Sequence, residues 1–142
     1  MKPNAPLFLA AALVAPVLAG EDTAQVLKQG QHGTVKLEQV VSGHLNDLNG
    51  RYKLRVTEVT YDPAGYIGEH HHVGPGIRCV TVGELTYVQT DKTSVYRSGD
   101  CFFESGGVTH TASNRTDRPT VLLNFEVLPA DWSGGSAIPM PR

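Results

Sequence analysis

The sequence has few charged residues and no run of either sign. Charged residues make up 18% of the 142-residue chain, and the formal net charge is −2 at pH 7. Proteins that bind nucleic acid or an anionic membrane surface instead concentrate lysine and arginine on one face. No basic stripe with interleaved aromatic residues is present either. We therefore expect no nucleic-acid partner and no attachment of the mature chain to a membrane.

The sequence also lacks the 3.6-residue apolar period of amphipathic helices, apart from one turn around 44–48. Short segments with alternating or β-branched character follow one another instead, and clusters of Gly, Pro, Asn and Asp separate them. This pattern predicts an all-β sandwich or barrel. The expected strands are 34–41, 52–61, 68–72, 77–82, 85–90, 93–97, 100–104, 108–113 and 120–128.

Long apolar runs are missing except near the start of the chain. Met1 and Lys2 precede the run "LFLAAALVAPVLA", which ends in small residues at Ala19. This pattern is typical of a cleaved secretory signal peptide over residues 1–19, and it predicts export to a periplasm or the medium. A retained membrane anchor is the less favoured alternative, because residues 5–19 are short for a span and two prolines interrupt the region.

The exported chain would form one domain. We expect a lead-in at 20–33, a β-domain at 34–129 and an irregular tail at 130–142, from which Trp132 packs back onto the domain.

The segment "GEHHH" at 68–72 places three histidines in a row on an expected strand. Side chains alternate between the two faces of a strand, so His70 and His72 share a face while Glu69 and His71 point away. A metal site on this face needs another imidazole, and His110 in "GGVTHTASN" is the best candidate. His32 and His44 lie among polar, turn-rich residues and are interpreted as surface histidines.

Two motifs around these histidines resemble those of small single-domain cupins, over roughly residues 34–128. In the first motif, Gly65 lies one residue closer to His70 than the cupin pattern requires. In the second motif, Ser105 occupies the usual proline position. The matching residues are Gly65, His70, His72 and Gly83, then Gly99, Gly107, His110 and Asn114. The resemblance implies a jelly-roll β-barrel with His70, His72 and His110 facing one metal inside it.

The chain departs from the cupin pattern at Gly76, which occupies the position of the usual glutamate ligand. Three neutral imidazoles still suit zinc, iron, copper or nickel, and manganese is a further possibility. The resemblance then points to three-histidine cupins such as thiol dioxygenases and diketone-cleaving dioxygenases, which use ferrous iron. A degenerate cupin that has lost its metal is the alternative, although retention of all the histidines argues against it.

Strand alternation also places Arg78, Val80 and Val82 on the inner face with position 76, and Phe102 and Glu104 on the inner face of a neighbouring strand. Glu104 is then a candidate fourth ligand, a partner of a histidine N–H or a base, and Arg78 a candidate binder of an anionic substrate. A structural ion pair between Arg78 and Glu104 is the alternative, slightly favoured without a bound ligand.

The sequence contains only two cysteines, Cys79 and Cys101, both expected on the outer face. An exported protein can form a disulfide. With Arg78 opposite Glu104, however, the cysteines would be diagonal neighbours, so a bridge between them is the less favoured alternative. The expected core or pocket-lining residues are Phe102, Phe103, Val121, Leu123 and Phe125.

The leading functional hypothesis is a metal-dependent dioxygenase acting on a small organic acid or diketone-like compound, with His70, His72 and His110 as metal ligands and Arg78 and Glu104 as catalytic residues. The alternative is a non-catalytic module that binds a metal or small metabolite. The resemblance to small cupins implies a homodimer, which we expect here as well.

Overall fold

The computed structural model describes residues 24–140, and the expected signal peptide lies outside these residues. The described chain is all-β, as predicted. None of its residues belongs to a helix long and apolar enough to cross a membrane. The strands are β1 Lys28–Val40, β2 Tyr52–His72, β3 Gly76–Val82, β4 Glu84–Gln89, β5 Lys92–Arg97, β6 Cys101–Glu104, β7 His110–Ser113, β8 Thr120–Pro129 and β9 Ala137–Ile138.

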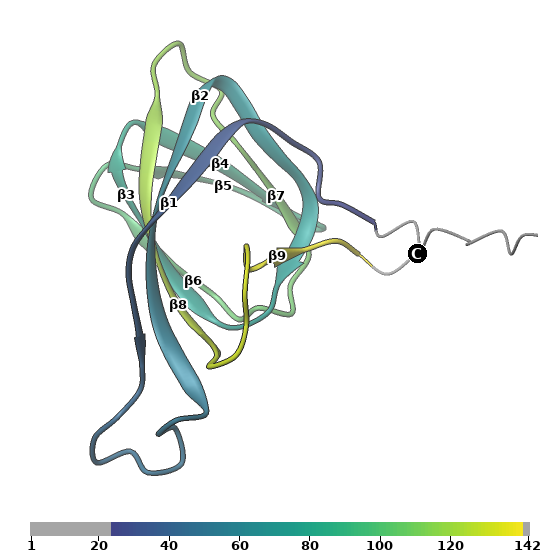
Figure 1. Cartoon of the computed structure of the whole chain (residues 1–142). Coiled ribbons are helices and arrows are strands. Elements are labelled where there is room, and N and C mark those ends of the chain that lie inside the picture. The colour runs from purple at the N-terminus through teal and green to yellow at the C-terminus, as the bar shows by residue number, and fades with distance from the viewer. Residues whose placement is uncertain (1–23, 141–142) are drawn as a thin grey trace, which may run out of the picture.

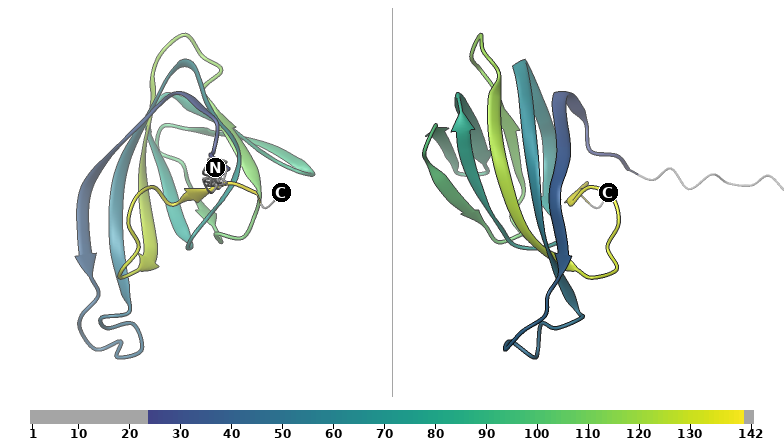
Figure 2. Two further views of the ribbon diagram at one scale, coloured as in Figure 1. Left: turned by 45° about the vertical axis from the view of Figure 1, so that its right-hand side comes forward. Right: turned by 60° about the vertical axis from the view of Figure 1, so that its left-hand side comes forward.

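The strands form one antiparallel sheet that curls into a nearly closed barrel (Figure 1). Its order is β5-β4-β7-β2-β8-β3-β6, and β1 and β9 both pair with β2. The hairpin between β1 and β2 extends away from the barrel, whereas the chain after β8 turns back across its open end (Figure 2). Strand β1 begins at Lys28 and not at residue 34, so part of the expected lead-in belongs to the barrel.

Strand β2 combines two strands that the sequence analysis separates at Asp62–Gly65. Its first part, from Tyr52 to Tyr61, pairs with β8. Its last part pairs with β7 and begins at Tyr66. Pro63 has no amide hydrogen for a ladder, which explains why the strand changes partner at these turn-forming residues. Asn114 secures the bend, because its side-chain amide donates to the carbonyl oxygens of Tyr61 and Asp62. The change of partner brings the histidines at the end of β2 beside β7.

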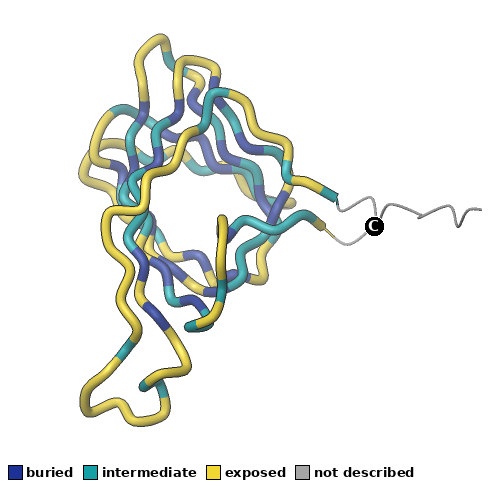
Figure 3. Tube along the Cα trace, in the orientation of Figure 1, coloured by how far each residue is buried: buried dark blue, intermediate teal, exposed yellow. Residues whose placement is uncertain are grey.

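The core lies inside the barrel, where alternate residues of β2, β3, β7 and β8 are buried over much of their length (Figure 3). Phe102 packs against this core, as expected, but Phe103 and Phe125 are exposed. On β8 the buried positions are Thr120, Leu122, Glu126 and Leu128, so the expectation for Val121, Leu123 and Phe125 was wrong by one residue. The inner face of β8 is the more polar one, since it carries Thr120, Asn124 and Glu126, whereas alternation alone assigns the more apolar face to the inside. Val82 is also exposed, because the β3–β8 register shifts between Val80 and Val82.

Phe103 and Phe125 form an apolar patch on the outside of the barrel, together with neighbours on β1, β2 and β3. Phe103 is the most exposed member, at 69%. A groove of about 420 Å³ runs over this patch. The patch contains Leu37, Leu54, Ile77, Phe103 and Phe125.

The cysteines form a disulfide, which is the less favoured alternative of the sequence analysis. Cys79 of β3 lies directly opposite Cys101 of β6, and their Cα atoms are 4.1 Å apart. The expected register placed Arg78 opposite Glu104, whereas Arg78 lies opposite Phe102. The long arginine side chain reaches Glu104 diagonally, so a contact between these two residues does not fix the strand register.

We expect the Cys79→Ser/Cys101→Ser variant to be about 3 kcal/mol less stable than the oxidised wild type. The disulfide closes a loop with a sequence separation of 22, which restricts the unfolded chain. Urea unfolding measures the loss, and the wild type under reducing conditions should lose the same amount. Equal free energies of unfolding for variant and oxidised wild type would contradict this.

Candidate metal centre

Three buried histidines meet inside the barrel, as predicted. His70 and His72 come from the end of β2, and His110 lies directly opposite His70 on β7. One ring nitrogen from each residue lies within 4.8 Å of the others. His71 points away from the cavity and pairs with Ile138 of β9. Glu69 is exposed, and so are His32 and His44, also as expected.

Hydrogen bonds fix the orientation of the His70 and His110 rings. His70 Nδ1 lies 2.7 Å from the Gly68 carbonyl oxygen, and His110 Nδ1 lies 3.0 Å from the Val108 carbonyl oxygen. A carbonyl oxygen only accepts hydrogen bonds, so Nδ1 carries the hydrogen in both rings. Each neutral ring therefore keeps its lone pair on Nε2, which is the nitrogen available to a metal.

The same tautomer follows for His72 through two residues. His72 Nδ1 lies 3.1 Å from Ser136 Oγ, and Ser136 Oγ in turn contacts Glu126 Oε1. Because a carboxylate only accepts, the serine hydroxyl must donate to Glu126 and accept from the His72 Nδ1–H. His72 Nε2 thus also carries a lone pair.

Burial keeps these imidazoles neutral at pH 7. It lowers the pKa of His70 to about 4 and that of His72 to about 2. It also lowers the pKa of His110, against the opposing effect of the nearby Glu104 charge. Neutral imidazole is the form that binds metals, so the cluster is ready for a metal ion without first losing protons.

The Glu104 carboxylate lies against two of these nitrogens. Its Oε1 is 3.1 Å from His110 Nε2, and its Oε2 is 3.3 Å from His72 Nε2. The carboxylate faces the cavity, as strand alternation predicted. Its catalytic role, like that of Arg78, remains a prediction.

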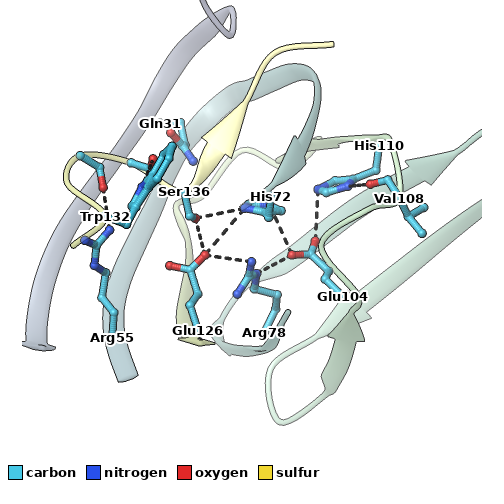
Figure 4. Close-up of polar contacts among 12 residues, drawn as sticks. Gln31, Arg55, His72, Arg78, Glu104, Val108, His110, Glu126, Trp132 and Ser136 are labelled. Carbon is cyan, nitrogen blue, oxygen red and sulfur yellow. Dashed lines mark hydrogen bonds and ion pairs between the residues drawn. The ribbon is translucent and has the colours of Figure 1, made fainter. Parts of the chain in front are cut away.

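Arg78 joins this carboxylate to a second one. Arg78 Nε lies 2.6 Å from Glu104 Oε2, and Arg78 Nη2 lies 3.1 Å from Glu126 Oε1. All these side chains are buried. Figure 4 shows that the contacts close into a ring running from His72 through Glu104, Arg78, Glu126 and Ser136 back to His72.

The sequence analysis missed Glu126 and Ser136. Glu126 shares alternate positions with Leu122 and Leu128, on the face of β8 that the sequence analysis placed outside, so it was overlooked. No local pattern could have indicated Ser136, because it lies in a tail without regular alternation.

Residues 57–126 match the cupin domain family. The match includes both histidine segments and the two strands that carry Glu104 and Glu126. The chain is a cupin.

Several solved structures share the fold of this cupin. The polyketide cyclase RemF from Streptomyces resistomycificus has a TM-score of 0.58 at 15% identity, with 90% of this chain and 88% of that chain covered. A cupin domain from Bordetella pertussis Tohama I has a TM-score of 0.52 at 23% identity, with 71% and 96% covered. KdgF from Halomonas sp. has a TM-score of 0.54 at 15% identity, with 78% and 89% covered.

These identities establish the fold and leave the activity open. No protein of curated function matches the sequence.

This cupin replaces the family glutamate by Gly76 and places a glutamate directly opposite it on each neighbouring strand. Glu104 faces Gly76 from β6, and Glu126 faces it from β8. A Cβ atom at position 76 would meet Arg78 Nη1 and would lie 2.5 Å from the Phe125 carbonyl oxygen. Glycine therefore makes room for the guanidinium between the two carboxylates, and the anionic groups come from the flanking strands.

The histidines open onto a cavity of about 390 Å³, which suits a small organic molecule. The ring of polar residues forms one wall, and Tyr87 and Phe102 contribute an aromatic wall. Lys28 and Gln31 of β1 also line the cavity, as do residues 134–137 of the tail.

Proposed function

We propose that this cupin binds one divalent transition metal through His70, His72 and His110, with Glu104 as an additional anionic ligand or neighbour. We further propose that the metal-loaded protein is a dioxygenase that acts on a small organic acid or diketone-like compound. The buried three-histidine cluster and the adjoining cavity support the proposal.

The observation that carries the metal proposal is the position of the Glu104 carboxylate. Its two oxygens lie 3.1 and 3.3 Å from ring nitrogens whose lone pairs face the cavity. A negative oxygen and a nitrogen lone pair repel each other at this distance unless they share a proton or a metal cation. A divalent ion would satisfy both groups, and three imidazoles with a carboxylate suit first-row metals.

A bound ferrous ion would supply Lewis acidity and electron transfer toward molecular oxygen. The protein's own residues would position the reactants. Arg78 holds the Glu104 carboxylate, and Glu104 can accept an acidic C–H proton from a substrate in the cavity. In such a reaction both atoms of one oxygen molecule enter the products, and the substrate supplies all the electrons. No external reductant is then needed.

A non-catalytic module that binds a metal or small metabolite is the second candidate. The pairing of Arg78 with both Glu104 and Glu126 favours it, because neither carboxylate is without a cationic partner. These ion pairs occupy Nε and Nη2 of Arg78 and leave Nη1 without a hydrogen-bond partner.

Purified protein expressed with its own leader tests both candidates. Elemental analysis identifies the metal, and an oxygen electrode measures uptake over a panel of small acids, thiols and diketones. Bound iron with substrate-dependent uptake supports the dioxygenase, whereas bound metal without uptake supports the binding module. Protein that takes up none of Fe(II), Zn(II), Mn(II), Ni(II) or Cu(II) would overturn the dioxygenase and the metal-binding module, and would leave only a module that binds a small metabolite.

We also propose that the chain is exported and forms a homodimer. The Cys79–Cys101 disulfide supports an oxidising compartment, and the outer apolar patch of Leu37, Leu54, Ile77, Phe103 and Phe125 supports self-association. Cell fractionation with mass determination of the processed chain tests export. Sedimentation analysis tests the dimer, and a cytosolic or monomeric product would contradict the respective proposal.

A further inference from the structure

The chain after β8 forms a strap over the open end of the barrel, which we define as residues 130–138 (Figures 1 and 2). Its last residues, Ala137–Ile138, form β9 and pair with His72 and His71 of β2. The Val73 amide donates to the Ser136 carbonyl oxygen at 3.0 Å. The strap thus lies beside the strand segment that supplies two of the three histidines.

Buried cations of β2 hold the other end of the strap. Lys53 Nζ donates to the Trp132 carbonyl oxygen at 2.5 Å, and Arg55 Nη1 donates to the Gly134 carbonyl oxygen at 2.6 Å. Glu38 pairs with both cations. If the strap left the barrel, these buried donors would lose acceptors, which is costly inside a protein. The interior charges therefore favour a docked strap.

Ser136 gives this docking a consequence for the metal centre. The Nδ1 atoms of His70 and His110 are held by backbone carbonyl oxygens two residues earlier, at Gly68 and Val108. His72 has no such local acceptor in the structure. Its Nδ1 is instead held by Ser136 Oγ from the strap, and Glu126 orients that hydroxyl (Figure 4).

We propose that the strap is a working part of the metal centre, in which Ser136 is a positioning residue for His72. Docking of Ser136 selects the tautomer and ring orientation that direct His72 Nε2 toward the other two imidazoles. This inference rests on the proposed metal site. Because coupling between two binding events is reciprocal, a bound metal must stabilise the docked strap as much as the docked strap strengthens metal binding.

Ser136→Ala tests the proposal, with Ser133→Ala as the matched control in the same strap. Ser133 is exposed, whereas Ser136 is buried. Competition against a chromophoric zinc chelator should show about 10–100-fold weaker Zn(II) binding by Ser136→Ala, the usual effect of losing the partner of a metal-ligating histidine. Ser133→Ala should bind like the wild type, and the visible spectrum of bound Co(II) should change only in Ser136→Ala.

Hydrogen exchange on the wild type provides a measurement that needs no variant. The Val73 amide, which bonds to the strap, should exchange more slowly once Zn(II) is bound, and Ser136→Ala should show less of this protection. Wild type that binds Zn(II) with unchanged Val73 exchange, or Ser136→Ala with wild-type affinity, overturns the role of the strap and leaves the metal site intact. Wild type that binds no metal overturns both.

Discussion

His72→Ala is expected to abolish metal binding while leaving the barrel folded. The substitution removes one of three converging ring nitrogens, and no other described histidine lies close enough to replace it. Loss of a ligand's outer partner alone weakens binding by about 10–100-fold, so loss of the ligand itself should exceed this range. Elemental analysis of protein incubated with the metal should give a stoichiometry near zero for the variant.

Thermal unfolding provides the companion measurement. Metal at about 100 times its dissociation constant should stabilise the wild type by about 2.7 kcal/mol, or about 10 °C for a domain of this size. His72→Ala should show no shift. His71→Ala is the matched control, because its ring is the next along the strand and points away from the cavity. Equal metal-dependent shifts in His72→Ala and wild type would contradict the three-histidine site.

Arg78→Met is expected to destabilise the protein by about 3–5 kcal/mol. The substitution keeps most of the apolar stem but leaves Glu104 and Glu126 buried without their shared cation. Removal of one partner from a buried ion pair costs this much because the remaining charge cannot regain its hydration. Such a loss is a large fraction of the 5–15 kcal/mol by which typical domains are stable, and urea unfolding at pH 7 measures it.

Arg97→Met is the matched control for this prediction. Arg97 also pairs with a glutamate, through an Nε–Oε2 distance of 3.0 Å to Glu84, but its side chain is 68% exposed. A solvated pair of this kind contributes about 0–1 kcal/mol, so the control should lose little stability. A divalent metal should restore part of the stability of Arg78→Met by supplying positive charge beside Glu104. Equal losses for the two arginine variants would contradict the buried charge network.

Strand patterning predicted the all-β fold and the three-histidine cluster because both depend on local order. His70 and His72 are two residues apart on one strand, so the strand geometry itself puts them on one face. The spacing of the second motif then identified His110. The same alternation correctly assigned Arg78, Glu104 and Phe102 to the inside and His71 to the outside.

Predictions that needed strand register or an inner-face assignment failed where the sequence allows two solutions. Phe103 and Phe125 are as apolar as core residues, and only the packed sheet decided that they are exposed. The cysteines show the problem with strand register. The expected pairing of β3 with β6 differs from the observed one by two residues, because the contact between Arg78 and Glu104 is diagonal. A shift of two residues leaves every side chain on the same face of its strand. Patterning alone cannot detect such a shift.

The sequence by itself therefore determined the barrel, its histidines and the missing family glutamate. Only the tertiary structure decided how the site is completed. Glu126 and Ser136 reach His72 from β8 and from the strap, far along the chain, and Gly76 admits Arg78 between two glutamates on neighbouring strands. Contacts of this kind depend on how the barrel closes and on the path of the strap across it. The alternation of residues along a single strand determines neither.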